Sequence, residues 1–207
     1  MKMICYMYRI FLHPFDSLAR LKEKRDEGWL LPALLSALLL LLSNIVEYQY
    51  TDFTFNTNRV DQLNIWLMLF KTVGLLALWV LSNWSFCTLF DGEGTLKQIF
   101  VMSSLVLVPY SISLLLKTGL SLLLVAEEEI FLSWIVLLGQ IYSGVLMLIG
   151  LYVIHGFTVK KTIFTVLFTV VGIVIILFIM ALLFSLVQQF SAFIMTIFSE
   201  ISLIIGG

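Results

Sequence analysis

The chain has 207 residues, of which 61% are hydrophobic and 12% are charged, and its formal net charge is −1. Soluble domains are about half apolar and about one quarter charged, so this composition excludes an ordinary soluble domain, which needs a polar exterior. The near-neutral charge also argues against a nucleic-acid partner, because nucleic acids are bound by basic surfaces.

Residues 1–28 precede the first long apolar run and are rich in cations. Within them, residues 14–27 have the pattern of an amphipathic helix, since Phe15, Leu18 and Leu21 recur at helical spacing. A basic amphipathic helix beside a membrane span lies in the headgroup layer, where anionic lipids attract it. We therefore predict a cytoplasmic interface helix here; the alternative is that its cations only set the topology.

Five apolar runs follow, and each is long enough to cross a membrane. A bilayer core about 30 Å thick needs about 20 apolar residues of helix. The runs lie at residues 29–48, 64–90, 98–116, 130–154 and 162–187. We therefore predict an all-α fold, a polytopic membrane helix bundle with five transmembrane helices that forms a single domain over residues 29–187.

The positions of Lys and Arg predict how the chain is threaded. The N-terminal segment and the loops after the second and fourth runs hold nine of these cations, whereas the opposite loops hold only Arg59 and Lys117. Cytoplasmic loops are enriched in Lys and Arg, so the N-terminus should be cytoplasmic. Five crossings then place the C-terminus outside. We expect a multi-pass protein of the cell (cytoplasmic) membrane.

The C-terminal tail, residues 188–207, is shorter and more polar than the five runs. Its apolar residues are interrupted by side chains such as Gln189 and Glu200. We predict a helix that lies on the outer membrane surface. A sixth crossing over residues 188–205 is the alternative, and the sequence leaves it open.

Lys71 is the one cation that the threading does not explain, because it lies inside the second run. Ionisable residues within spans are costly and are functional candidates by default. The run enters from the outer side, so the Lys71 side chain can reach the membrane surface. It can also pair with Glu47, Asp61 or the cluster of residues 127–129. We favour such an anchor or ion pair over a transport site.

Pro109 interrupts the third run, and Gln140 is a polar residue in the fourth. A proline inside a span frees a backbone carbonyl and can kink the helix. Together with Lys71, these two residues would line a polar path in a small transporter or channel. Most of the runs are apolar on all sides, however, which argues against a continuous path.

The turn between the second and third runs is the sharpest local feature. Its candidate interaction residues are Asp91, Gly92, Glu93, Gly94 and Lys97. The two glycines allow backbone conformations that other residues avoid. Thr95 and Gln98 have the spacing of a capping box for the next helix. The acidic residues would repel phosphate, so we predict a tight capped turn on the cytoplasmic face.

Enzymatic chemistry finds no support in the sequence. His13 and His155 are the two histidines, and neither has Cys or carboxylate neighbours at metal-ligand spacing. No nucleophile motif is present either. We expect no catalytic residue, no metal and no cofactor.

Several short motifs together resemble a known family. They are His13-Pro14-Phe15, Lys22 and Gly28 before the first run, Asn83-Trp84 late in the second, the turn from Leu89 to Leu96, and Pro109-Tyr110 in the third. The chain resembles the bacterial branch of the Yip family, whose eukaryotic relatives are Rab-GTPase-interacting membrane proteins. Leu105 and Val106 depart from the aromatic residue and serine that relatives often have there.

The resemblance implies a membrane scaffold or adaptor and not an enzyme. We therefore expect a scaffold or accessory subunit that contacts the lipid bilayer and binds another membrane protein, such as a transporter or an envelope or trafficking component. Rab partners are not carried over to this chain. The alternatives are the small transporter or channel and a lipid-binding or bilayer-shaping protein. Self-association stays open.

Overall fold

The computed structural model describes residues 9–23, 28–56, 58 and 62–205, and these residues form helices and turns without any strand. The elements are α2 (Pro14–Glu23), α3 (Leu30–Tyr50), α4 (Ile65–Leu69), a π-helical turn (Phe70–Gly74), α5 (Leu75–Leu89), α6 (Leu96–Val106), α7 (Val108–Ser121), a 3₁₀ turn (Ala126–Glu128), α8 (Glu129–His155) and α9 (Val159–Ile205).

Five stretches of the described chain are long and apolar enough to cross a membrane. They are Leu30–Tyr50, Ile65–Leu89, Leu96–Ser121, Ala126–His155 and Val159–Phe198. Each contains most of one run that the sequence singled out, so the predicted all-α, five-helix membrane bundle is confirmed. Which terminus faces which side stays a prediction.

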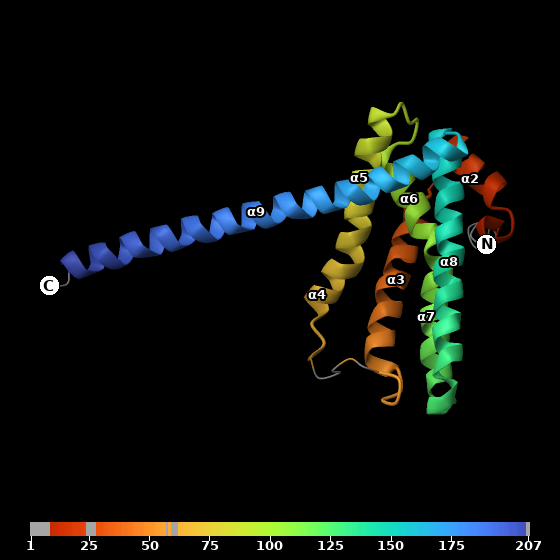
Figure 1. Cartoon of the computed structure of the whole chain (residues 1–207), viewed down its shortest axis with the longest axis horizontal. Helices are drawn as coiled ribbons and strands as arrows, with labels where there is room; N and C mark the ends of the chain where they lie inside the picture. The colour runs from red at the N-terminus through yellow and green to blue at the C-terminus, as the bar shows by residue number, and fades with distance from the viewer. Residues whose placement is uncertain (1–8, 24–27, 57, 59–61, 206–207) are drawn as a thin grey trace.

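The third span is the centre of the bundle. In its most apolar 18-residue stretch 61% of the residues are buried, whereas in the corresponding stretches of the other four spans 28% or fewer are buried. Its two halves, α6 and α7, contact α3 and α8, and α6 also contacts α5. Figure 1 shows α3, α7 and α8 running alongside one another, with α9 crossing the group at one end. The first, second and fourth spans therefore assemble around α6 and α7, and the fifth packs on the outside against α5.

The third span is broken where the sequence predicted a kink. α6 ends at Val106 and α7 begins at Val108, with Pro109 in the first turn of α7. The hydroxyl of Ser111 donates to the carbonyl of Leu107, 3.2 Å away. The backbone N–H of Tyr110 donates to Ser143 Oγ of α8 at 3.1 Å. Side chains thus satisfy the backbone groups beside the break, as a membrane interior requires.

The predicted interface helix packs against protein. In α2, Leu18 and Leu21 are buried and belong to the same apolar cluster as Met102 and Ile154 of the bundle. Phe15 remains half exposed, and its ring meets that of Tyr152 edge-on. The helix ends at Glu23, and residues 24–27 lie outside the described part of the chain. The apolar edge of α2 therefore faces α6 and α8.

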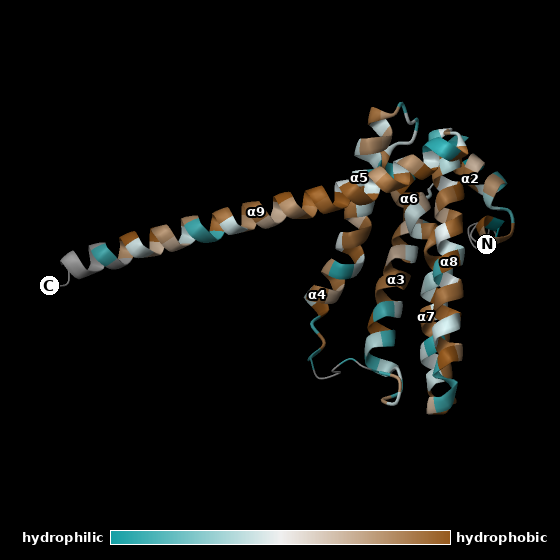
Figure 2. Ribbon diagram, in the orientation of Figure 1, coloured by the Kyte–Doolittle hydropathy of each residue, from teal (hydrophilic) through white to brown (hydrophobic). Residues whose placement is uncertain are grey.

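α9 is one continuous helix of 47 residues. Its first part packs against α5, with Thr165, Thr169 and Gly172 buried. From Leu177 to Phe198 every residue is exposed. Figure 2 shows hydrophobic residues along most of this projecting length. The helix does not break near residue 188, and the placement of residues 188–207 on the outer surface stays a prediction.

Candidate functional site

A cluster of buried polar side chains lies where α5, α8 and α9 meet. We call Asn83, His155 and Thr169 the polar cluster; their exposed fractions are 0%, 2% and 0%. Asn83 Nδ2 donates to Thr169 Oγ1 at 3.1 Å, and Asn83 Oδ1 lies 3.3 Å from His155 Nε2. An amide oxygen only accepts, so this contact assigns the imidazole proton to Nε2. Three separate spans are thereby joined by hydrogen bonds.

Neighbouring groups extend the polar cluster along α5 and α9. Ser82 Oγ donates to the carbonyl of Thr169 at 2.7 Å, and Thr169 Oγ1 donates to the carbonyl of Thr165 at 2.8 Å. The thiol of Cys87 lies 3.5 Å from Asn83 Oδ1. His155 Nδ1, by contrast, is buried without a hydrogen-bond partner. The cluster is otherwise satisfied, so its main effect is to fix the three spans relative to one another.

The turn after α5 closes over the imidazole of His155. A Cβ atom on Gly92 would lie 2.7 Å from His155 Nδ1, and one on Gly94 would lie 2.7 Å from His155 Cε1. Such distances are too short for real side chains, so both positions need glycine for close approach. We had expected unusual backbone angles at these glycines; instead Asp91 adopts the left-handed conformation, with φ of 57°.

Asp91 completes a Schellman motif at the end of α5. The N–H of Gly92 donates to the carbonyl of Cys87 at 2.7 Å, and the N–H of Asp91 donates to that of Thr88 at 3.4 Å. These are the two bonds that define the motif, in which the left-handed residue follows the helix. The turn is therefore held from one side by the end of α5 and from the other by His155.

Gln98 ties the same turn to α2. Its Oε1 accepts from the N–H of Thr95 at 3.0 Å, and Thr95 Oγ1 accepts from the N–H of Gln98, which confirms the predicted capping box. Gln98 Nε2 donates to the carbonyl of Lys22 at 3.1 Å. Lys22 Nζ also lies 2.7 Å from Glu93 Oε2, with the Glu93 side chain 63% exposed. Such an exposed pair contributes little, about 0–1 kcal/mol, so the buried Gln98 contacts dominate.

Replacing Gln98 with leucine should loosen the contact between the end of α2 and the bundle. The change removes the acceptor for the Thr95 N–H and the donor to the Lys22 carbonyl, whereas Thr95 Oγ1 still caps α6; each lost hydrogen bond costs about 1 kcal/mol. Limited proteolysis in detergent should cut near Glu23 faster than in the wild type. Gln62→Leu, at an exposed position, is the matched control. Equal cleavage rates for the two variants would contradict this role of Gln98.

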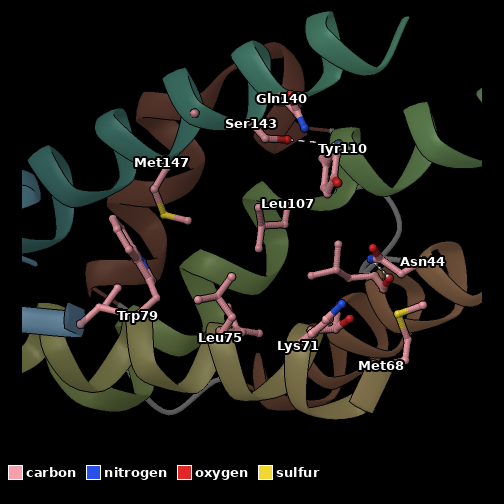
Figure 3. Close-up of a pocket in the computed structure, with 15 residues that line it drawn as sticks. Asn44, Met68, Lys71, Leu75, Trp79, Leu107, Tyr110, Gln140, Ser143 and Met147 are labelled. Atoms are coloured by element: carbon pink, nitrogen blue, oxygen red, sulfur yellow. Dashed lines mark hydrogen bonds between the residues drawn. The ribbon is translucent and has the colours of Figure 1, made fainter. Parts of the chain in front are cut away.

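A second feature is a cavity of about 570 Å³ between the spans. Its lining includes Asn44 of α3, Lys71 of the π-helical turn, Tyr110 of α7 and Gln140 of α8. Figure 3 shows Lys71 and Asn44 near one end of the cavity, and Trp79 and Met147 toward the other. The cavity thus has a polar end and an apolar end.

The structure divides the candidate residues from the sequence into two groups. Asn83, Gly92 and Gly94 surround His155, whereas Lys71 and Gln140 line the cavity. Pro109 lies beside the cavity residue Tyr110; Asp91 and Glu93 are exposed on the turn, and Lys97 is exposed in the first turn of α6.

Of the acidic residues expected to pair with Lys71, one is paired elsewhere and another lies outside the described residues. Glu47 pairs with Lys117, and Asp61 lies outside the described residues. Among the described residues, no ion pair reaches Lys71. Two members of the polar cluster, His155 and Thr169, were not among the candidates from the sequence, in which His155 was considered only as a metal ligand. The available signal was that a histidine at the end of a span needs polar partners.

Comparison with known proteins gives one match. The sequence model of the Yip1 domain matches residues 8–182 of the chain. No curated protein and no solved structure matches it. The matched range includes the polar cluster, the turn after α5 and every described residue that lines the cavity.

Proposed function

Because the chain belongs to the Yip family of membrane proteins, we propose that it is a membrane scaffold or accessory subunit that binds another membrane protein. Its multi-pass, lipid-embedded nature follows from the family and the five apolar spans. The part that we propose is the binding of a partner. It is supported by an ordered surface that lies over the polar cluster.

This surface comprises the exposed residues Arg20, Asp91, Lys97 and Lys160, from α2, the turn after α5, α6 and α9. We call it the turn surface. Buried contacts described above hold these segments: Gln98 joins α6 to α2, His155 packs beneath the turn, and Thr169 joins α9 to α5. A surface that is already ordered loses little conformational entropy on binding, which favours a docking role.

The proposal includes no catalytic step, cofactor or metal. The turn covers the imidazole of His155, and the thiol of Cys87 nearby is also buried, so both lie away from bulk water. The cavity is also less suited to transport than to binding, because it ends against the apolar side chains of Trp79 and Met147. These contacts favour the scaffold over the small transporter or channel.

In this proposal the protein lies in the cell membrane of a bacterium, and its turn surface faces the cytoplasm. The one-sided distribution of Lys and Arg supports this orientation. The short motifs given above support the bacterial branch of the family. A transporter or an envelope component is the class of partner that we propose for the turn surface.

Site-specific photo-crosslinking tests the proposal. A photoreactive amino acid at Lys97, in native membranes, should give a discrete adduct with a different membrane protein. The same amino acid at Leu123, which is exposed at the far end of the third span, should not. An adduct with a second copy alone, or no adduct at Lys97, Arg20 and Lys160, would contradict the proposed role.

A further inference from the structure

The cavity is lined from all five spans and has the size of a ligand site. Its volume of about 570 Å³ lies within the range of roughly 300–1,000 Å³ that is typical of small-molecule pockets. Leu40 and Asn44 come from α3, and Ile173 comes from the packed part of α9. The cavity therefore exists only when the five spans are packed together.

The lining changes from polar to apolar along the second span. Lys71, Leu75 and Trp79 follow one another at four-residue intervals along the second span, and all three line the cavity. Met147 of α8 joins Trp79 at the apolar end, whereas Asn44 lies near Lys71 (Figure 3). A ligand that matches this order has a polar head and an apolar chain.

The polar end has a positive charge and no acidic neighbour in the lining. Lys71 is the ionisable cation there, and the described lining residues include no Asp or Glu. Thr72, Tyr110 and Gln140 add hydroxyl and amide groups that donate hydrogen bonds. A cation within a span is costly unless a counter-charge accompanies it, so an anionic head complements this end.

The backbone at Lys71 is also irregular. Residues Phe70–Gly74 form a π-helical turn between α4 and α5. π-Helical turns are rare, and those inside α-helices are frequent at functional sites. This turn interrupts the second span at the residue that carries the charge. The irregularity is independent of the charge argument and points to the same end of the cavity.

We propose that the cavity binds one anionic phospholipid. Its phosphate contacts the ammonium of Lys71 and the nearby hydroxyl and amide donors. One acyl chain follows Leu75 toward Trp79 and Met147, and the other chain stays in the bilayer. Lys71 lies within two helical turns of the start of the second span at Ile65, so its long side chain can extend toward the headgroup layer. The inference does not depend on the scaffold role, which concerns the opposite end of the bundle.

Native mass spectrometry of the full chain, released from membranes with equal phosphatidylglycerol and phosphatidylcholine, tests the proposal. The wild type should retain one phosphatidylglycerol. Lys71→Gln should lower its affinity by about tenfold or more, because a hydrogen bond to a charged group is lost. Lys71→Arg should retain the lipid, and Arg9→Gln, at an exposed position outside the cavity lining, is the charge control.

A second variant blocks the cavity by volume. Gly144 lines the cavity, and a Cβ atom there meets nothing within 4 Å, so Gly144→Phe introduces a ring beside the cavity without a clash at Cβ. Gly119 also meets nothing within 4 Å and lies outside the lining, which makes Gly119→Phe the matched control. Melting temperatures in detergent confirm that all variants fold.

Loss of the lipid in Lys71→Gln and Gly144→Phe, but not in their controls, is the expected result. Equal retention of the two lipids by the wild type would overturn the proposal. So would unchanged phosphatidylglycerol binding in either Lys71→Gln or Gly144→Phe, because the first removes the charge and the second the space.

Discussion

Replacing Asn83 with leucine should lower the free energy of unfolding by about 2–3 kcal/mol, because buried polar partners then lose their hydrogen bonds. Asn83 is fully buried and contacts both His155 and Thr169. Leucine has a similar volume, so the loss comes from unpaired polar atoms and not from a cavity. Equilibrium unfolding of the purified protein in mixed detergent micelles measures the change.

The matched control for Asn83 is Asn58→Leu, because Asn58 is exposed. A double variant sharpens the test, since Asn83→Leu with His155→Leu removes both partners at once. Replacing both members of a buried polar pair costs less than the two single changes added together. Simple additivity, or an effect of Asn83→Leu as small as that of the control, would show that the polar cluster does not hold the spans together.

Replacing Gly172 with leucine should detach α9 from α5. A Cβ atom at Gly172 would lie 2.2 Å from Phe86 Cε2 and 2.4 Å from Ser82 Oγ, so the helices must separate. Separation also removes the hydrogen bond from Ser82 to the carbonyl of Thr169. Overpacking alone costs about 1–3 kcal/mol, and the lost hydrogen bond adds to it.

Cross-linking between α5 and α9 measures the separation caused by Gly172→Leu. The rings of Phe90 and Phe168 lie with their centroids 5.6 Å apart, so cysteines at these two positions, which leave Phe86 in place, should react with a short bifunctional reagent. The reaction should be lost with Gly172→Leu and kept with Gly144→Leu, which has open space around it. Efficient cross-linking in the Gly172 variant would mean that α9 is held elsewhere.

Features that depend on nearby residues were predictable from the sequence. The five spans follow from apolar length, and the capping box follows from the three-residue spacing of Thr95 and Gln98. The break at Pro109 follows from proline itself. In each case the residues that set the feature are close together in the chain, so no tertiary contact is needed to infer it.

Features that depend on distant partners were not predictable. The apolar edge of α2 suits lipid and protein equally, and only the tertiary fold shows that Leu18 and Leu21 meet α6 and α8. His155 and Asn83 are 72 residues apart, so their contact leaves no local pattern. The glycines of the turn look like conformational hinges in the sequence, whereas they make room for an imidazole from another helix.

The length of α9 has a consequence for how much membrane area the protein occupies. A straight helix of 40 residues, as in the span Val159–Phe198, is about 60 Å long, twice the thickness of a hydrocarbon core of about 30 Å. An unbroken apolar helix of this length stays within the core only when steeply inclined, and it then extends about 50 Å sideways. Figure 1 shows α9 crossing the bundle and projecting well beyond it. The projecting part of α9 would thus prevent other membrane proteins from packing closely against that side of the bundle.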